Sequence, residues 1–211
     1  MEILVLSALH QLHGEVGYYT YDHLARIIEN FAPDILAVEL TPTDLQERKP
    51  QSVKQEYQHS VYPLLDKLRS KVVPLEPPEP TFSELVQMGK RAREDLQKRD
   101  PAAMEQFAMY VHALYDVLLS WWHSPRDVNS AETDRHFEIK HRYQGALFGE
   151  NETRGWELWN QYFLEQILVE ATKNTRGRML VLVGVEHSYW LRGRLREQVG
   201  VQHLEADAVL I

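Results

Sequence analysis

The strongest strand signal in this chain is the run Met179-Leu180-Val181-Leu182-Val183. The run is apolar and does not alternate with polar residues, which is typical of a strand covered on both faces. We expect Gly184 to turn the chain from this strand into a helix that carries Leu191 and Leu195 on its apolar side. The segment therefore predicts one strand–helix unit of a parallel sheet.

Similar apolar runs occur near the N-terminus, each separated from the next by a helical pattern. They read Ile-Leu-Val-Leu at 3–6, Ile-Leu-Ala-Val at 35–38 and Val-Val-Pro-Leu at 72–75. Pro74 has no backbone N–H to donate to a ladder, so we place the third run at an edge of the sheet. Strands alternate with helices in the first 76 residues and again after residue 150. This order predicts an α/β fold with a mainly parallel central sheet and helices on both faces.

Residues 81–150 differ from both flanks because they consist of long helical patterns. Asp100-Pro101 fits a helix N-cap followed by the first helical residue. Thr81 and Glu84 fit a capping box, in which each side chain accepts a hydrogen bond from a free backbone N–H group. We interpret 81–150 as a helical insertion or cap within a single α/β domain that spans 1–211, because both ends of the chain build the same sheet.

Composition excludes several classes of function. The chain has 31 acidic and 23 basic side chains, a formal net charge of -8, and no basic block that would neutralise nucleic-acid phosphates or an anionic membrane surface. It has no cysteine, so disulfides, thiolate metal sites and cysteine nucleophiles are excluded. The short apolar run behind Glu2 lacks the basic start of a secretory signal. No apolar run approaches the roughly 20 residues that span a bilayer. We expect a cytoplasmic protein whose partner is a small-molecule or peptide substrate.

Polar side chains follow each predicted strand at its carboxyl end, where parallel α/β sheets place their sites. The candidate catalytic residues are His10, Glu39, Glu76 and His187. A second tier of neighbouring candidates comprises His13, Glu15 and Glu186. The sequence therefore predicts that two imidazoles and two carboxylates share one rim of the sheet.

Each candidate also has a structural interpretation. Glu39 follows four apolar residues, and a buried carboxylate needs a cation, a metal or a hydrogen-bond donor beside it, so it could simply pair with an arginine. His187 opens a helix, whose positive end disfavours protonation and favours a neutral imidazole. His10 could be an ordinary loop histidine, and Glu76 a solvated acid.

Other histidines have a structural interpretation only. We expect Glu132, His136 and His141 to form a solvated polar face of one helix. His112 lies among apolar residues, and we expect it at the edge of the core.

Three short segments resemble one superfamily. They are Ser7-Ala8-Leu9-His10, Val38-Glu39-Leu40 and Gly184-Val185-Glu186-His187. Together they resemble motifs of the TraB/Tiki/ChaN/erythromycin-esterase superfamily, over roughly residues 1–80 and 154–200. The Tiki-like pattern has glycine where this chain has Ser7.

The resemblance implies an α/β core with inserted helices and a site of histidines and acids. By position, the site residues that the resemblance implies are His10, Glu39 and His187. Glu76 would correspond to the acid after the third strand. Members of the superfamily resemble metal-dependent proteases, hydrolyse esters or bind haem, so a shared fold does not settle the function.

Our leading hypothesis is a hydrolase. His10, Glu39 and His187 would hold a divalent metal such as Zn or Mn, since nitrogen and oxygen ligands suit these ions. The metal would lower the pKa of a bound water to about 7, and the remaining carboxylate would act as general base. In a metal-free version, a Glu–His pair activates water directly.

Two further classes remain open. A non-catalytic protein would bind haem or another flat ligand in the same pocket, among aromatic residues such as Trp156 and Tyr189. A scaffold that keeps only the fold would have no ligand, and His10 and His187 would lie far apart.

Overall fold

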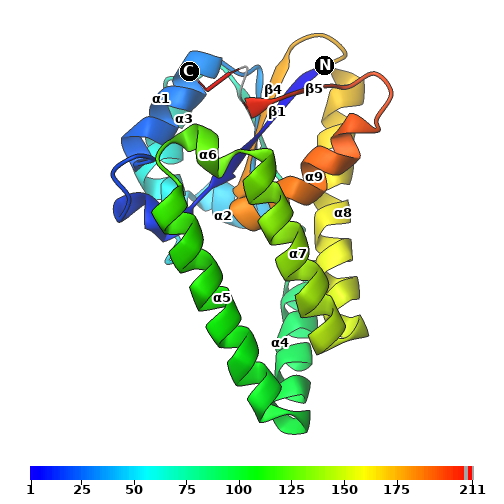
Figure 1. Ribbon diagram of the computed structural model, residues 1–211. Coiled ribbons are helices and arrows are strands. Elements are labelled where there is room, and N and C mark those ends of the chain that lie inside the picture. Colours follow the sequence, from blue (N-terminus) through cyan, green and yellow to red (C-terminus); the bar gives the residue numbers. More distant parts are fainter. Residues whose placement is uncertain (207–208, 211) are drawn as a thin grey trace.

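The computed structural model describes residues 1–206 and 209–210, which form an α/β fold around one sheet (Figure 1). All neighbouring strands are parallel, in the order β3-β2-β4-β1-β5. The strands are β1 (Glu2–Ala8), β2 (Ile35–Val38), β3 (Lys71–Pro74), β4 (Arg178–Gly184) and β5 (Gln202–Leu204). The predicted fold class is confirmed, and the strand that contains Pro74 lies at an edge as predicted.

The register of the three central strands brings their carboxyl ends to one rim. Ala8 of β1 pairs with Gly184 of β4, and Val38 of β2 pairs with Leu182 of β4. The residues that follow β1, β2 and β4 therefore emerge side by side.

Alternate side chains of the strands point to opposite faces of the sheet, as the pleat requires. Leu6, Val38 and Leu182 belong to one buried cluster, whereas Val5 and Val183 belong to another. The first cluster is covered by α1 (Tyr21–Phe31), the π-helix η2 (Tyr57–Val61), α3 (Tyr62–Leu65), the C-terminal half of α5 (Pro101–Trp121) and α6 (Pro125–Val128). The second is covered by α8 (Glu150–Lys173) and α9 (Val185–Arg196).

The helices between β3 and α8 form an arm that extends away from the sheet (Figure 1). This arm consists of α4 (Thr81–Arg99), α5 and α7 (Ala131–Phe148), and it has a small core of its own that includes Leu96, Phe107 and Phe148. Asp100 caps α5 as predicted, since its side chain accepts a hydrogen bond from the Ala103 N–H at 3.0 Å.

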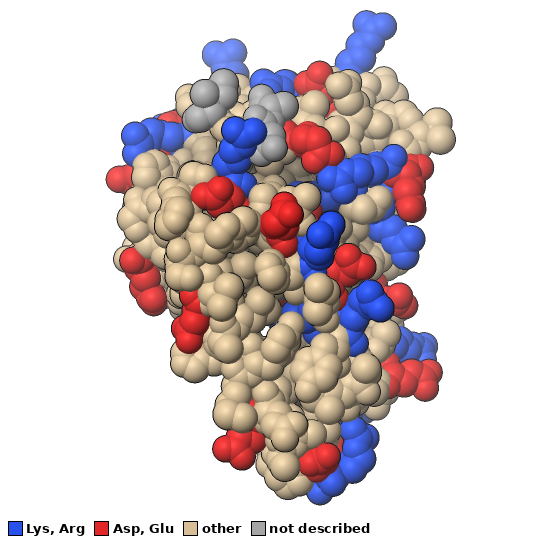
Figure 2. Space-filling view, in the orientation of Figure 1, with Lys and Arg blue, Asp and Glu red and all other residues tan. Residues whose placement is uncertain are grey.

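Two predictions about the arm are wrong. Thr81 is already helical, and the N-cap position of α4 is Pro80, so the capping box does not form. His112 is 80% exposed on α5 and lies 3.5 Å from Asp116, so it does not border the core. The surface over α5 carries few charges (Figure 2).

The remaining short elements are the 3-10 helix η1 (His10–Gly14) and α2 (Pro42–Glu47). None of the helices in the described ranges has both the length and the apolar character needed to cross a bilayer.

Candidate active site

Three of the four predicted site residues meet around Gly184 at the carboxyl end of β4. A Cβ atom built on Gly184 would lie 2.6 Å from His10 Nε2 and 3.4 Å from Glu39 Oε2. The Nε2 atom of His187 lies 3.9 Å from Glu39 Oε1. Glu76 is connected to Glu39 through a lysine, as described below. The four strand-end side chains therefore do lie at one rim of the sheet.

His10 is held from behind by a buried acid. Its Nδ1 atom lies 2.9 Å from Oε1 of Glu56, a residue with no exposed surface. His10 has a φ of 54°, in the left-handed region that non-glycine residues adopt at a cost and often at functional sites. Burial alone would lower the pKa of His10, but the hydrogen bond and the charge of Glu56 raise it above its ordinary value. The hydrogen bond to Glu56 places the proton on Nδ1 in the neutral ring and leaves Nε2 with a lone pair.

Glu39 is an anion that the sheet holds firmly. Its Oε2 atom accepts the backbone N–H of Gly184 at 2.6 Å, and its Oε1 atom lies 2.9 Å from Nζ of Lys54. Although burial acts to raise it, the pKa of Glu39 is lowered by the charges of Lys54 and His187. The cation expected beside this carboxylate is therefore present, and it is a lysine rather than an arginine.

Lys54 joins the two acids that follow β2 and β3. Its Nζ atom donates to Glu76 Oε1 at 2.5 Å and to the carbonyl oxygen of Glu39 at 3.0 Å. One cation thus faces two buried carboxylates. Burial and the charge of Glu39 raise the pKa of Glu76, so Glu76 is the member of this pair that takes up a proton more readily.

His187 approaches Oε1 of Glu39, the oxygen that Lys54 also contacts, and its protonation state is set by its surroundings. Its Nδ1–H group donates to Asn160 Oδ1 at 2.9 Å, because the Asn160 amide nitrogen already donates to the carbonyl of Trp156. Its ring stacks on Trp156 at a centroid distance of 4.4 Å. Burial lowers the pKa of His187 to about 4. The neutral imidazole expected from the sequence is supported, but burial rather than the helix end is the main cause.

The second-tier residues do not all join this group. His13 is buried, accepts the Leu9 N–H on Nε2 at 2.9 Å and bonds the Tyr19 carbonyl through Nδ1 at 2.6 Å, so it fixes the turn that carries His10. Glu15 is exposed on the following turn. We therefore correct the prediction for both: neither is part of the centre.

Glu186 forms a separate polar cluster beside the centre. It contacts Lys140 Nζ at 2.6 Å, His141 Nε2 at 3.0 Å and the Tyr115 hydroxyl at 2.9 Å. His141 is buried and stacks on the other face of Trp156 at 3.7 Å, so its assignment to a solvated face was wrong. The ring of Trp156 thus lies between His141 and His187.

The sequence did not point to Lys54, Glu56 or Asn160. Lys54 and Glu56 lie in a polar segment without helical or strand periodicity, and their positions depend on how that segment packs. The only available signal was the requirement that a buried Glu39 must have a partner. Asn160 is a fully buried amide on the predicted helix of Trp156, which the apolar pattern of that helix did not reveal.

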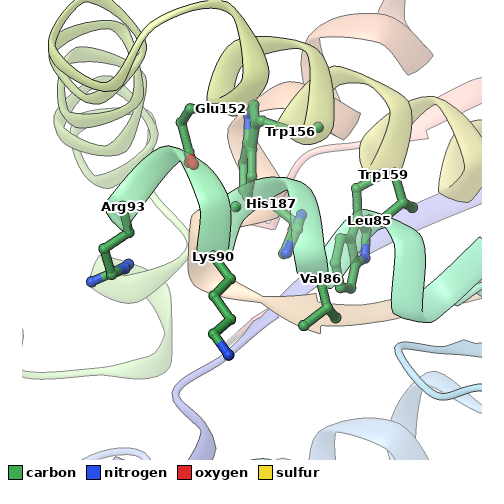
Figure 3. A pocket seen from close by; sticks show the side chains of 10 residues that line it. Leu85, Val86, Lys90, Arg93, Glu152, Trp156, Trp159 and His187 are labelled. Carbon is green, nitrogen blue, oxygen red and sulfur yellow. The ribbon is translucent and has the colours of Figure 1, made fainter. Parts of the chain in front are cut away.

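Two cavities reach this group of residues. A cavity of about 210 Å³ is lined by His10, Leu12, Tyr115, Gly184, Glu186 and His187, among others. A larger one of about 450 Å³ lies between α4 and α8, with His187 at its inner end (Figure 3). His187 lines both, so it is the residue that the two cavities share.

The donor set does not fit a divalent metal in this conformation. Within residues 1–206 and 209–210, no three histidine or acidic side chains come together as metal ligands. Both oxygens of Glu39 are engaged, one by Gly184 and the other by Lys54, whose ammonium group already supplies the positive charge. A metal at His10, Glu39 and His187 thus remains a prediction.

No protein-family model, no curated protein and no solved structure matches this chain. The resemblance to the TraB/Tiki/ChaN/erythromycin-esterase superfamily therefore stays a prediction that rests on the three short motifs.

Proposed function

We propose that the protein is a hydrolase of esters or amides in which His10 activates a water molecule. The observation that supports this proposal most directly is the pair formed by His10 and Glu56. A buried carboxylate holds one nitrogen of the ring, the other nitrogen lies against Gly184, and His10 lines the cavity of about 210 Å³. An imidazole oriented in this way by a carboxylate is suited to general acid–base catalysis.

His10 and His187 differ in basicity, which assigns them different roles. Glu56 raises the pKa of His10, so His10 is the more basic of the two rings and its Nε2 atom takes up and returns the proton. Burial lowers the pKa of His187 to about 4, so its ring stays neutral and accepts a hydrogen bond from water or substrate. Groups whose pKa values are driven apart in one site are expected to divide the acid and base work.

The reaction begins when a water oxygen attacks the carbonyl carbon of the substrate while His10 Nε2 takes a proton from that water. The new C–O bond gives a tetrahedral intermediate with a negative oxygen. His10 then returns the proton to the leaving oxygen or nitrogen, the bond to that atom breaks, and a carboxylic acid and an alcohol or amine are released. The charge of Glu56 stabilises the imidazolium between the two transfers.

The beginning of α9 is placed to stabilise the negative oxygen. Val185, Glu186 and His187 line the cavity in the first turn of this helix, and no side chain caps that turn. Free N–H groups and the positive end of the helix dipole favour a negative charge there. Glu39 holds the Gly184 N–H, which fixes the direction in which β4 enters α9.

The test is a hydrolysis assay with 4-nitrophenyl esters and 4-nitroanilides on purified protein. We expect turnover that falls by about 10² to 10⁴ in His10→Ala, the range that a positioned acid–base group contributes. His112→Ala is the matched control, because His112 is exposed on α5 and lines neither of these two cavities. No turnover by the parent protein, or equal turnover in His10→Ala, would refute the proposal.

A binding protein without catalysis is the second candidate. The cavity of about 450 Å³ has Trp156 and Trp159 in its wall and the unprotonated ring of His187 at its inner end. Such a pocket also suits haem or another flat ligand. A Soret band on haem titration that disappears in His187→Ala, together with no hydrolysis, would favour this alternative.

A further inference from the structure

The larger cavity has an apolar wall on both of the helices that form it. Leu85 and Val86 come from α4, and Trp156 and Trp159 come from α8 (Figure 3). A volume of about 450 Å³ is in the range of pockets that hold small organic ligands. The indole faces provide a large rigid surface for an alkyl chain or an aromatic ring. The wall therefore fits the apolar body of a ligand.

Two cations stand at the rim of this cavity. Lys90 and Arg93 extend from the same edge of α4 as Val86 (Figure 3). The ammonium group of Lys90 lies 3.9 Å from Glu94, and both side chains are well exposed, so this pair is weak. The guanidinium of Arg93 lies 6.0 Å from the centre of the Phe148 ring, and its charge acts on Glu152, which lines the same cavity.

The acid in the same cavity does not cancel these charges. Glu152 is the acidic residue among the lining side chains, and its Oε1 atom accepts a hydrogen bond from Gln144 at 2.5 Å. Burial raises the pKa of Glu152, although the charge of Arg93 acts to lower it. The lining side chains therefore include two cations and one acid. The rim is thus positive in a chain whose net charge is -8.

We propose that the α4–α8 cavity binds the acyl portion of a substrate that carries a carboxylate at its far end. The carboxylate would pair with Lys90 and Arg93, the chain would lie along Trp156 and Trp159, and the ester or amide carbonyl would reach the small cavity past His187. The substrate class is then the half-ester or half-amide of a dicarboxylic acid. This inference rests on the proposed function, since it names the substrate of the same centre.

A binding experiment tests the cavity independently of catalysis. Decanoate is titrated into the protein by isothermal titration calorimetry, because it combines a carboxylate with an apolar chain. We expect Kd to rise about tenfold in the double variant Lys90→Glu/Arg93→Glu, as expected for the loss of two exposed charge contacts. The control is Arg91→Glu/Lys98→Glu, which changes the charge equally on exposed positions of α4 that do not line the cavity. Equal Kd values in the two double variants would overturn the inference.

A kinetic experiment then compares two esters of equal chain length, 4-nitrophenyl octanoate and the mono-4-nitrophenyl ester of suberic acid. We expect the parent protein to prefer the suberate ester in kcat/KM, and Lys90→Glu/Arg93→Glu to lose that preference through KM while kcat is kept. Hydrolysis without any preference for the suberate ester would reject the cavity inference and leave the hydrolase intact. Decanoate binding that depends on Lys90 and Arg93, with no ester cleaved, would support the cavity and reject the hydrolase.

Discussion

His10 and Gly184 approach each other so closely that residue 184 has no room for a side chain. The Nε2 atom of His10 lies 2.6 Å from the point that a Cβ atom would occupy, which is closer than carbon and nitrogen atoms come without bonding. Gly184 has φ -54° and ψ 144°, a conformation that any residue adopts. The glycine is therefore required for the contact with His10 and not, as the sequence indicated, for the turn from β4 into α9.

Gly184→Ala should abolish most of the hydrolysis while leaving the fold intact. The new methyl group would push the His10 ring away from its position between Glu56 and the cavity. Overpacking of a single methyl group costs about 1–3 kcal/mol, which a domain of this size tolerates. We expect kcat/KM to fall by about 10², the loss typical of misplaced reacting groups. Kinetics and urea unfolding measure the two effects. Gly193→Ala is the control, since a Cβ there meets no atom within 4 Å.

Glu56→Gln should change the pH dependence of the reaction. The hydrogen bond and charge of Glu56 raise the pKa of His10. The glutamine side chain carries no charge, so burial becomes the dominant effect in the variant and the pKa of His10 falls. The base form of His10 then persists to lower pH, and the acidic limb of the kcat/KM profile moves to lower pH while the plateau falls. The control is Glu15→Gln, because Glu15 is an exposed acid in the segment that begins with His10. An unmoved limb in Glu56→Gln would mean that another group controls the profile.

Lys54→Met should destabilise the protein by about 3–5 kcal/mol at neutral pH, the cost of removing one partner from a buried charge group. Glu39 and Glu76 would lose their shared cation, and the pKa values of both would rise in the folded state. A folded-state pKa above the unfolded value favours folding at low pH and loses that advantage as pH rises. The defect should therefore be smallest near pH 4 and grow toward pH 8.

Urea unfolding across this pH range measures that trend. Lys67→Met, at an exposed position, should remain within about 0.5 kcal/mol of the parent protein. A defect in Lys54→Met that is independent of pH would show that the two carboxylates are not the groups that Lys54 compensates.

Removal of divalent metal should leave turnover unchanged, because Lys54 already supplies the positive charge at Glu39. Dialysis against a chelator, with metal content checked by mass spectrometry, tests this expectation. Activity that is lost on dialysis and restored by Zn or Mn would instead support the metal site predicted from His10, Glu39 and His187. Magnesium alone serves as the control addition, since it prefers oxygen ligands.

The centre of the sheet could be predicted from the sequence because β1, β2 and β4 are short, buried apolar runs. Short apolar runs of this kind indicate buried strands. Pro74 has no N–H group to donate, which indicated that β3 lies at an edge of the sheet. The residues at the rim could be predicted as well, because the carboxyl ends of parallel strands lie at the same edge of the sheet. His10, Glu39 and His187 were found in this way.

The supports of the site could not be predicted, because they come from parts of the chain without a periodic pattern. Lys54 and Glu56 acquire their roles only when η2 packs on the sheet and buries them beside the rim. His141 reads as one polar residue among many on α7, yet the indole of Trp156, from another helix, removes it from water. Burial of a polar side chain by a distant element leaves no local trace in the sequence.

The pairing of β1 with β4 has a consequence for the order of events during synthesis. His10 leaves the ribosome long before Gly184 and His187 are made, because residues 11–183 lie between them. A nascent chain therefore carries no assembled centre, and two separately produced fragments, one ending before the arm and one beginning at α8, would each be inert. The proposed activity would therefore be acquired late, when β1 pairs with β4.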